Sequence, residues 1–212
     1  MDRKVMFQAA AVAALAALVA AILQAVSAFS LPSGIQIQPG YPVPLDQFVR
    51  ATNDHTETTL GFFGSDSLFI ISYLVVFIGL YLRTVDHARP FAQIGLLMGI
   101  LTAVLDATEN AYFITYALGA KAGLPLTAPD LPLVYVITNL KWMAAFATLL
   151  TFGLVHPRRA PLDMLIVALM LLFPLIGVLG VANPGLIAFR GLFFLVGMPL
   201  FAFAFWRQSQ AA

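Results

Sequence analysis

The sequence contains no cysteine among its 212 residues. Disulfide bonds, thiolate zinc sites, iron–sulfur clusters and cysteine nucleophiles are therefore excluded. Charged residues are also scarce, because they make up 10% of the chain, against about 25% in a typical soluble domain. The net charge is only +1 and no basic run is longer than a pair, so the composition does not favour nucleic acid as a partner.

Apolar residues are abundant instead, at 61% of the chain with a mean hydropathy of +0.92. Several apolar runs exceed the roughly 20 residues that cross a hydrocarbon core of about 30 Å. We therefore expect an all-α, polytopic membrane protein with six transmembrane helices in one bundle, a single domain over residues 1–212. The expected spans are 5–29, 60–82, 91–118, 133–155, 162–182 and 185–206, with a long first outer loop at 30–59.

The first apolar run resembles a signal peptide, because Val26-Ser27-Ala28 looks like a small-residue cleavage site. The apolar part of a signal peptide spans only about 7 to 15 residues, however, and residues 5–29 form a longer run. We therefore expect this run to remain as the first helix.

Basic residues near the ends of the spans are unevenly distributed between the two sides. Seven lie on one side (Arg3, Lys4, Arg83, Arg89, Arg158, Arg159 and Arg207), and two on the other (Arg50 and Lys121). The positive-inside rule then places both termini in the cytoplasm of a multi-pass cell-membrane protein of the bacterial inner-membrane type.

The outer loop contains an amphipathic pattern, because Leu45, Phe48 and Val49 recur at i, i+3 and i+4. Such a segment either lies on the membrane surface or caps the bundle, and a solvated loop fits equally well. Asp54, His55 and Glu57 follow it and resemble a ligand set. We interpret them as the approach to a helix N-terminus, where acidic residues suit the helix dipole.

Five ionisable residues interrupt the spans at one depth, the outer third of the membrane: Asp66, Asp106, Glu109, Lys141 and Arg190. At 1.5 Å per residue, Asp106 lies ~22 Å above the cytoplasmic edge and Asp66 lies ~9 Å below the outer edge. Isolated charges in lipid are costly, so we expect these side chains to pair. On the corresponding helix faces lie Asn110, Tyr135, Asn139 and Trp142, with Lys141 at the margin of its face.

The first functional hypothesis is a site that binds a small amphiphilic or zwitterionic ligand, because the carboxylates and the cations offer both signs of charge. Its predicted ligand-binding residues are Asp66, Asp106, Glu109, Asn110, Tyr135, Asn139, Lys141, Trp142 and Arg190. Transport is one version of this hypothesis, but the halves of the chain show no convincing inverted repeat.

Two other hypotheses stay open. An intramembrane enzyme would modify a lipid or isoprenoid with Asp106 or Glu109 as general acid or base, although D-x-x-E on a helix is weakly specific. A structural or assembly subunit of a membrane complex would use the charges to lock helices together and would bind another membrane protein. Membrane lipid is a partner in every case, and the sequence does not decide whether the chain is an enzyme.

The sequence indicates no cofactor. No histidine lies within a span, which disfavours a membrane-embedded bis-histidine haem. A Schiff base on Lys141 would suit a retinal-like chromophore, but lysines beside aromatic residues are too common to indicate one. A metal held by Asp66, Asp106 and Glu109 is disfavoured by the neighbouring cations, so we predict no metal site.

Overall fold

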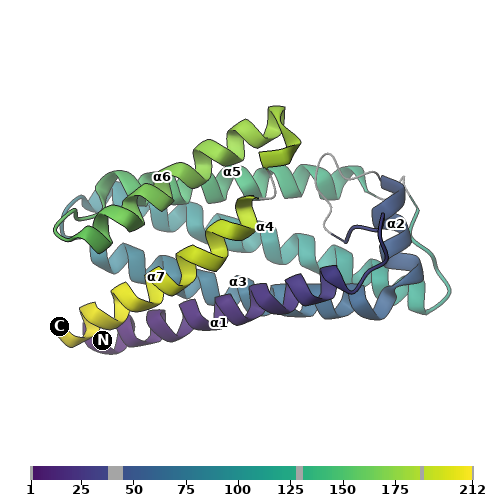
Figure 1. Ribbon diagram of the computed structural model, residues 1–212, viewed down its shortest axis with the longest axis horizontal. Coiled ribbons are helices and arrows are strands. Elements are labelled where there is room, and N and C mark those ends of the chain that lie inside the picture. The colour runs from purple at the N-terminus through teal and green to yellow at the C-terminus, as the bar shows by residue number, and fades with distance from the viewer. Residues whose placement is uncertain (1, 38–44, 128–130, 187–188, 212) are drawn as a thin grey trace.

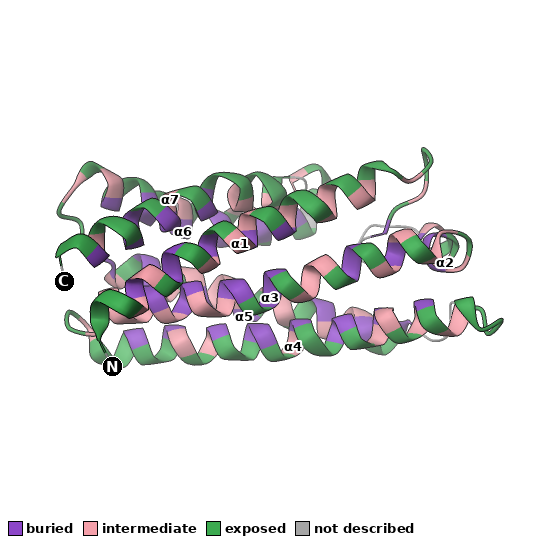
Figure 2. Cartoon of the chain, turned by 90° about the horizontal axis from the view of Figure 1, so that it is seen from below, coloured by how far each residue is buried: buried purple, intermediate pink, exposed green. Residues whose placement is uncertain are grey.

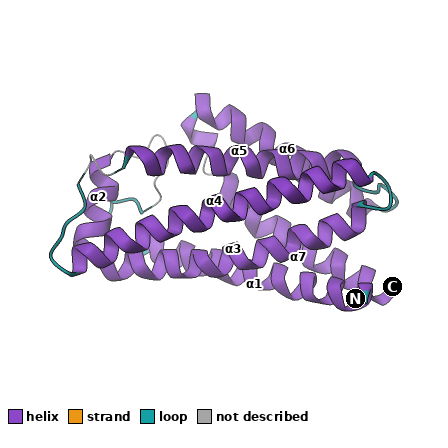
Figure 3. Ribbon diagram, turned by 180° about the vertical axis from the view of Figure 1, so that it is seen from behind, coloured by secondary structure: helices purple, strands orange, loops and turns teal. Residues whose placement is uncertain are grey.

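The computed structural model describes residues 2–37, 45–127, 131–186 and 189–211, and within these ranges the chain is helical with no strand (Figure 1). The elements in chain order are α1 (Arg3–Phe29), α2 (Leu45–Asp54), α3 (Thr56–Thr84), α4 (Arg89–Lys121), α5 (Pro132–Val155), α6 (Pro161–Ala182), the short 3-10 helix η2 (Pro184–Leu186) and α7 (Phe189–Ala211). Figure 3 shows the same helices from behind, joined by connections at the two ends.

Six of these helices, all except α2 and η2, are long and apolar enough to cross a membrane. The all-α, six-span fold predicted from the sequence is therefore confirmed. The last span begins at Phe189 and not at residue 185, because Pro184–Leu186 forms a separate turn. The longest helix, α4, has 33 residues and is about 50 Å long at 1.5 Å per residue, so it extends beyond a hydrocarbon core of about 30 Å.

Several helix starts follow from local chemistry. Pro90, Pro132 and Pro161 lie in the first turns of α4, α5 and α6, where the backbone N–H of the residue has no partner within the helix. Asp163 caps α6, because its Oδ2 accepts hydrogen bonds from the backbone N–H groups of Arg159 at 3.2 Å and Ala160 at 3.1 Å. The proline and the carboxylate together define where α6 begins.

The helices form a bundle in which α1 packs against α3 and α7, α4 lies between α3 and α5, and α6 joins α5 to α7. Both chain termini lie at one end of the bundle (Figure 1), which we call the terminal end. The opposite end carries α2, and we call it the α2 end. The assignment of the terminal end to the cytoplasm stays a prediction.

Small residues allow α1 to approach its neighbours closely. Ala10, Ala14 and Ala17 are at most 1% exposed. A Cβ atom on Gly79 of α3 would lie 2.7 Å from Cβ of Ala10 and 2.9 Å from the ring of Phe205 on α7. Small residues at membrane helix contacts let backbones approach in this way, so the alanine-rich sequence of α1 is explained by packing.

Large apolar side chains cover the outward faces of the long helices. Val12 is 65% exposed and Ile71 is 66% exposed, and Figure 2 shows exposed residues on the outside of the bundle with buried residues facing inward. A soluble protein rarely exposes so much contiguous apolar surface. The fold is therefore that of a multi-pass membrane protein.

The amphipathic segment in the first connection folds onto the bundle as α2. Phe48 is fully buried and meets the ring of Phe113 on α4 edge-on at 4.9 Å. The side chain of Asn53 donates to the carbonyl of Leu126 at 3.0 Å and accepts from the N–H of Leu126 at 2.9 Å. Of the interpretations left open by the sequence, the structure supports a cap on the α2 end.

Candidate functional site

Lys141 of α5 binds two carboxylates of α4. Its Nζ donates to Oδ1 of Asp106 at 2.8 Å and to Oε2 of Glu109. The two acids are three residues apart and therefore on one helix face. The side chains of Asp106 and Glu109 are 9% and 4% exposed, and that of Lys141 is 15% exposed. The expected pairing of opposite charges is present for these three residues.

Hydroxyl groups from the neighbouring helices complete the partners of the two acids. Tyr73 of α3 donates its phenolic hydrogen to Oδ2 of Asp106 at 2.9 Å, and Thr138 of α5 donates to Oε1 of Glu109. Asn110 donates to the carbonyl of Phe63 on α3 at 3.0 Å. The polar contacts of α4 thus connect it to both α3 and α5.

Asp66 of α3 is the least satisfied acid of the group. Gln24 of α1 donates from Nε2 to its Oδ1 at 3.0 Å. The other oxygen, Oδ2, has no hydrogen-bond partner among the described residues and is not fully enclosed. Asp66 interacts electrostatically with Asp106, Glu109 and Lys141. We call Asp66, Asp106, Glu109 and Lys141 the charge cluster, in which three carboxylates face one ammonium group.

Gln24 is a member of the site that the sequence reasoning missed. The signal was present, because Gln24 is a polar residue with a long side chain in the mostly apolar second half of the first span. Periodicity alone does not show which neighbour such a residue faces. The structure shows that this neighbour is Asp66, because α1 packs against α3 and places Gln24 at the level of that residue.

Arg190 does not meet the carboxylates, contrary to expectation. Its guanidinium carbon lies 4.2 Å from the ring centroid of Trp142 and 5.7 Å from that of Phe146. It forms no ion pair or hydrogen bond with any described residue, and its Nε is buried without a partner. The Nζ of Lys141 lies 5.6 Å from the same Trp142 ring, so Trp142 connects the charge cluster to Arg190.

The two rings beside this arginine, Trp142 and Phe146 of α5, belong to a cluster of aromatic rings that continues onto α6 and α7. Phe146 lies 6.0 Å from Trp142 and 5.6 Å from Phe173, and Phe173 lies 5.5 Å from Phe193, each distance joining ring centroids. The ring of Phe146 also packs directly against Gly177 of α6, where a Cβ atom would overlap it. We call Trp142, Phe146, Phe173, Phe193 and Arg190 the aromatic site.

Two other predicted ligand-binding residues lie apart from the charge cluster. Asn139 is exposed and donates to the backbone carbonyl of Tyr135 at 2.9 Å, within its own helix. The hydroxyl of Tyr135 is buried without a partner among the described residues. For Asn139 the reason is helical phase, because Thr138 and Lys141, three residues apart, define the face of α5 that meets α4, and the exposed Asn139 lies off that face.

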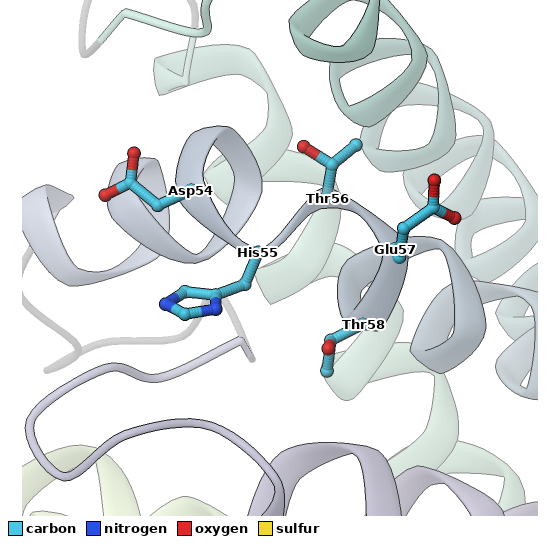
Figure 4. A pocket seen from close by; sticks show the side chains of 5 residues that line it. All are labelled: Asp54, His55, Thr56, Glu57 and Thr58. Carbon is cyan, nitrogen blue, oxygen red and sulfur yellow. The ribbon is translucent and has the colours of Figure 1, made fainter.

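The acidic residues near the start of α3 do not converge. Figure 4 shows Asp54, His55 and Glu57 pointing in different directions around an open hollow of about 360 Å³. Glu57 pairs instead with Lys121 at 2.6 Å, and both side chains are more than half exposed. Within the part of the chain that the structure describes, no three His, Asp or Glu side chains are placed to hold a metal ion.

The terminal end contains a second buried ion pair that the sequence reasoning missed. Arg83 of α3 donates to Oδ1 of Asp163 on α6, and their side chains are 12% and 6% exposed. His156, next to this pair, is 4% exposed, and neither ring nitrogen has a described partner. Burial lowers the pKa of His156 to about 4, and the positive charge of Arg83 contributes.

Fold and site together define a six-helix membrane protein with an intramembrane charge cluster beside an aromatic site. No protein-family model, curated protein or solved structure matches the chain. The function is therefore inferred from the chemistry of these two groups of residues.

Proposed function

We propose that the protein binds a small amphiphile through an anionic head group at the aromatic site, and that a zwitterionic head group fits best. The observation that carries the proposal is the guanidinium group of Arg190, which is half-buried and has no acceptor among the described residues. A guanidinium group offers five N–H donors and stays charged at every physiological pH. An anion is the partner that this environment lacks.

The surroundings of Arg190 favour a phosphate or carboxylate. Unpaired charges near lipid are costly, whereas a paired guanidinium forms two parallel, charge-assisted hydrogen bonds with such anions. The guanidinium carbon lies over the Trp142 ring, and a cation over an aromatic face keeps its N–H groups as hydrogen-bond donors. A head-group anion at these N–H groups would replace the missing acceptor.

The apolar part of the ligand has a surface to lie on. Leu192 and Leu195, on the same helix as Arg190, are 51% and 44% exposed, and Phe193 between them is half-buried in the aromatic site. A hydrocarbon chain on this surface would remain in the membrane while its head group meets Arg190. This arrangement supports an amphiphile in preference to a small soluble anion.

The charge cluster supports the zwitterionic form of the ligand. Three carboxylates face one ammonium group, and Oδ2 of Asp66 has no described hydrogen-bond donor. An amine on the ligand would supply a donor and a positive charge. The anionic part would then bind Arg190 and the amine would bind on the side of Asp66.

A second function, locking the helices together, is favoured for the rest of the cluster. Asp106 and Glu109 are both engaged by Lys141 and by a hydroxyl group, which leaves neither acid without a partner. For the same reason, acid–base catalysis by these two acids is the less suited alternative. We assign the locking role to Asp106, Glu109 and Lys141 and the binding role to Arg190, Trp142 and Asp66.

Trp142 provides a reporter for the test. The chain has two tryptophans, so Trp206→Phe leaves Trp142 alone. The full chain in a nonionic detergent is titrated with dihexanoylphosphatidylethanolamine, a zwitterionic amphiphile, and with octyl glucoside, an uncharged one. Arg190→Gln is compared with Arg207→Gln, a matched control on the same helix whose guanidinium carbon also lies over an aromatic ring, 5.9 Å from that of Phe203.

We expect the zwitterionic amphiphile to change Trp142 fluorescence saturably and octyl glucoside to have no such effect. Arg190→Gln should weaken binding at least about tenfold, because removing one partner of a desolvated charge pair costs about 2 kcal/mol or more. Arg207→Gln should leave the affinity within about twofold. Equal affinities in the two variants, or no saturable change at all, would overturn the proposal.

A further inference from the structure

A hollow of about 640 Å³ opens at the terminal end, far from the aromatic site. Its lining comes from α1, α3, α7 and the connections that precede α4 and α6. The polar residues of the lining are Arg3, Arg83, Asp86, His87, Arg159 and Gln208. We call this hollow the terminal pocket.

Two of the three arginines are neutralised by carboxylates. Arg3 makes a bidentate contact with Asp86, at 2.6 and 3.1 Å, and Arg83 pairs with Asp163. The hydrogen bond from Arg3 lowers the pKa of Asp86, so this acid stays ionised near neutral pH. Neither pair adds net charge to the pocket.

Arg159 is the surplus cation. Its Nη2 lies 3.0 Å from Nε2 of His87. A guanidinium group only donates, so the histidine nitrogen must be the acceptor, and it carries no negative charge. No described carboxylate pairs with the side chain of Arg159, which leaves one positive charge uncompensated. The Nε of Arg83 also lacks an acceptor among the described residues.

The pocket combines this charge with an apolar wall. Phe7 and Leu82 line it, and Phe7 is 3% exposed. The pocket lies where the polar helix ends meet the apolar spans, because Arg3 begins α1 and Arg83 comes one residue before the end of α3. This is the level of a lipid head group or of a soluble anion at the membrane surface.

We propose that the terminal pocket binds a phosphate-bearing anion through Arg159, with Arg3 and Arg83 lining the same site. A phosphate group is a strong multiple acceptor that suits planar guanidinium donors, and it would replace the neutral acceptor His87. The same chemistry is offered by a phosphomonoester lipid and by free phosphate. This inference is independent of the proposed function, which concerns the aromatic site and the charge cluster.

The test uses the full chain in nonionic detergent and carries Arg190→Gln throughout, so that the aromatic site does not contribute. Native mass spectrometry measures binding of dioleoylphosphatidic acid, with dioleoylglycerol as the phosphate-free comparison. Thermal unfolding with and without millimolar inorganic phosphate forms the second arm. Arg159→Gln is compared with Arg158→Gln, a matched control because Arg158 is also exposed but does not line the pocket.

We expect Arg159→Gln to weaken phosphatidic acid binding by about fivefold or more and Arg158→Gln by less than about twofold, as for loss of one charge-assisted contact. A loss confined to the lipid arm identifies a lipid head group. Stabilisation by phosphate that survives in Arg158→Gln but not in Arg159→Gln identifies a soluble phosphate. Equal losses in the two variants, or binding of neither probe, would overturn the inference.

Discussion

The terminal end and the charge cluster each contain a buried ion pair, but the balance of charge differs between them. At the terminal end, Asp163 accepts from Arg83 and from two backbone N–H groups, so one acid meets one base with every oxygen satisfied. At the level of the charge cluster, three carboxylates interact with the one ammonium group of Lys141, and Arg190 lies over Trp142 with no carboxylate partner among the described residues.

We relate this difference in charge balance to two roles, stabilising the fold and binding a ligand. A balanced pair in which both carboxylate oxygens of the acid accept hydrogen bonds holds α3 against α6 and adds no net charge. An unbalanced group with an open carboxylate oxygen and an unpaired guanidinium retains both signs of charge inside the spans. Ionisable residues inside membrane spans commonly indicate functional sites, and this applies to the unbalanced group.

The largest effect is expected for Lys141→Met. The substitution keeps most of the side-chain volume but leaves Asp106 and Glu109 without their cation, and breaking a buried pair from one side costs about 3–5 kcal/mol. The free energy of unfolding, measured by SDS titration in mixed micelles, should fall by this order. A loss below about 1 kcal/mol would contradict the locking role.

The next largest effect is a loss of stability at acidic pH, which we attribute to His156 at the terminal end. The pKa of His156 is about 4 in the folded protein against about 6.5 unfolded, so the unfolded chain binds more protons between these values. Stability is fully present above pH 6.5 and falls as the pH drops to about 4, by at most about 3.4 kcal/mol at 1.36 kcal/mol per unit.

Carboxylates titrate in part of the same range, so the comparison is with His156→Phe. In this variant the loss of unfolding free energy between pH 6.5 and 4 should be smaller than in the original chain. The groups facing His156 are Arg83, Asp163 and His87, and they are unchanged. Identical pH profiles would show that His156 does not contribute.

A smaller effect on stability, with a consequence for binding, is expected for Gly177→Ala. The added methyl group would overlap the ring of Phe146, which must move within the aromatic site. Overpacking of this kind costs about 1–3 kcal/mol. Gly191→Ala is the matched control, because a Cβ atom there meets nothing within 4 Å. Amphiphile affinity should fall in the first variant only, and equal affinities would mean that Phe146 does not shape the site.

The smallest effect is expected for Gln24→Leu. The change removes the hydrogen bond to Asp66, worth about 1 kcal/mol net, and partly offsets the loss with an apolar side chain that suits lipid. Unfolding free energies of the variant and the original chain, measured side by side, test this. A loss as large as that of Lys141→Met would mean that Asp66 belongs to the locked part of the cluster.

The sequence was sufficient to predict the six spans and the meeting of Asp106, Glu109 and Lys141, because hydropathy and helical rise are local properties. It was also sufficient to predict that the two acids share a face of one helix. The depth of Arg190 was inferred in the same way, yet its partner was wrong. Depth gives the position along a helix but not the direction around the bundle.

Other residues escaped prediction because their roles depend on which helices are neighbours. Gln24 reaches Asp66 only because α1 packs on α3. Asp163 lies near the start of a span, where the sequence alone indicates only an acidic residue in the first turn of a helix. Its pairing with Arg83 depends on α3 lying beside the start of α6. Neither contact leaves a periodic signal in the sequence.

The most direct test of the separation between locking and binding measures two quantities on two variants. The affinity for dihexanoylphosphatidylethanolamine and the free energy of unfolding are determined for Arg190→Gln and Asp106→Asn. We predict that Arg190→Gln loses at least about tenfold in affinity with its stability unchanged, and that Asp106→Asn loses stability with its affinity within about twofold. The reverse pattern, with affinity lost in Asp106→Asn and retained in Arg190→Gln, would contradict the account.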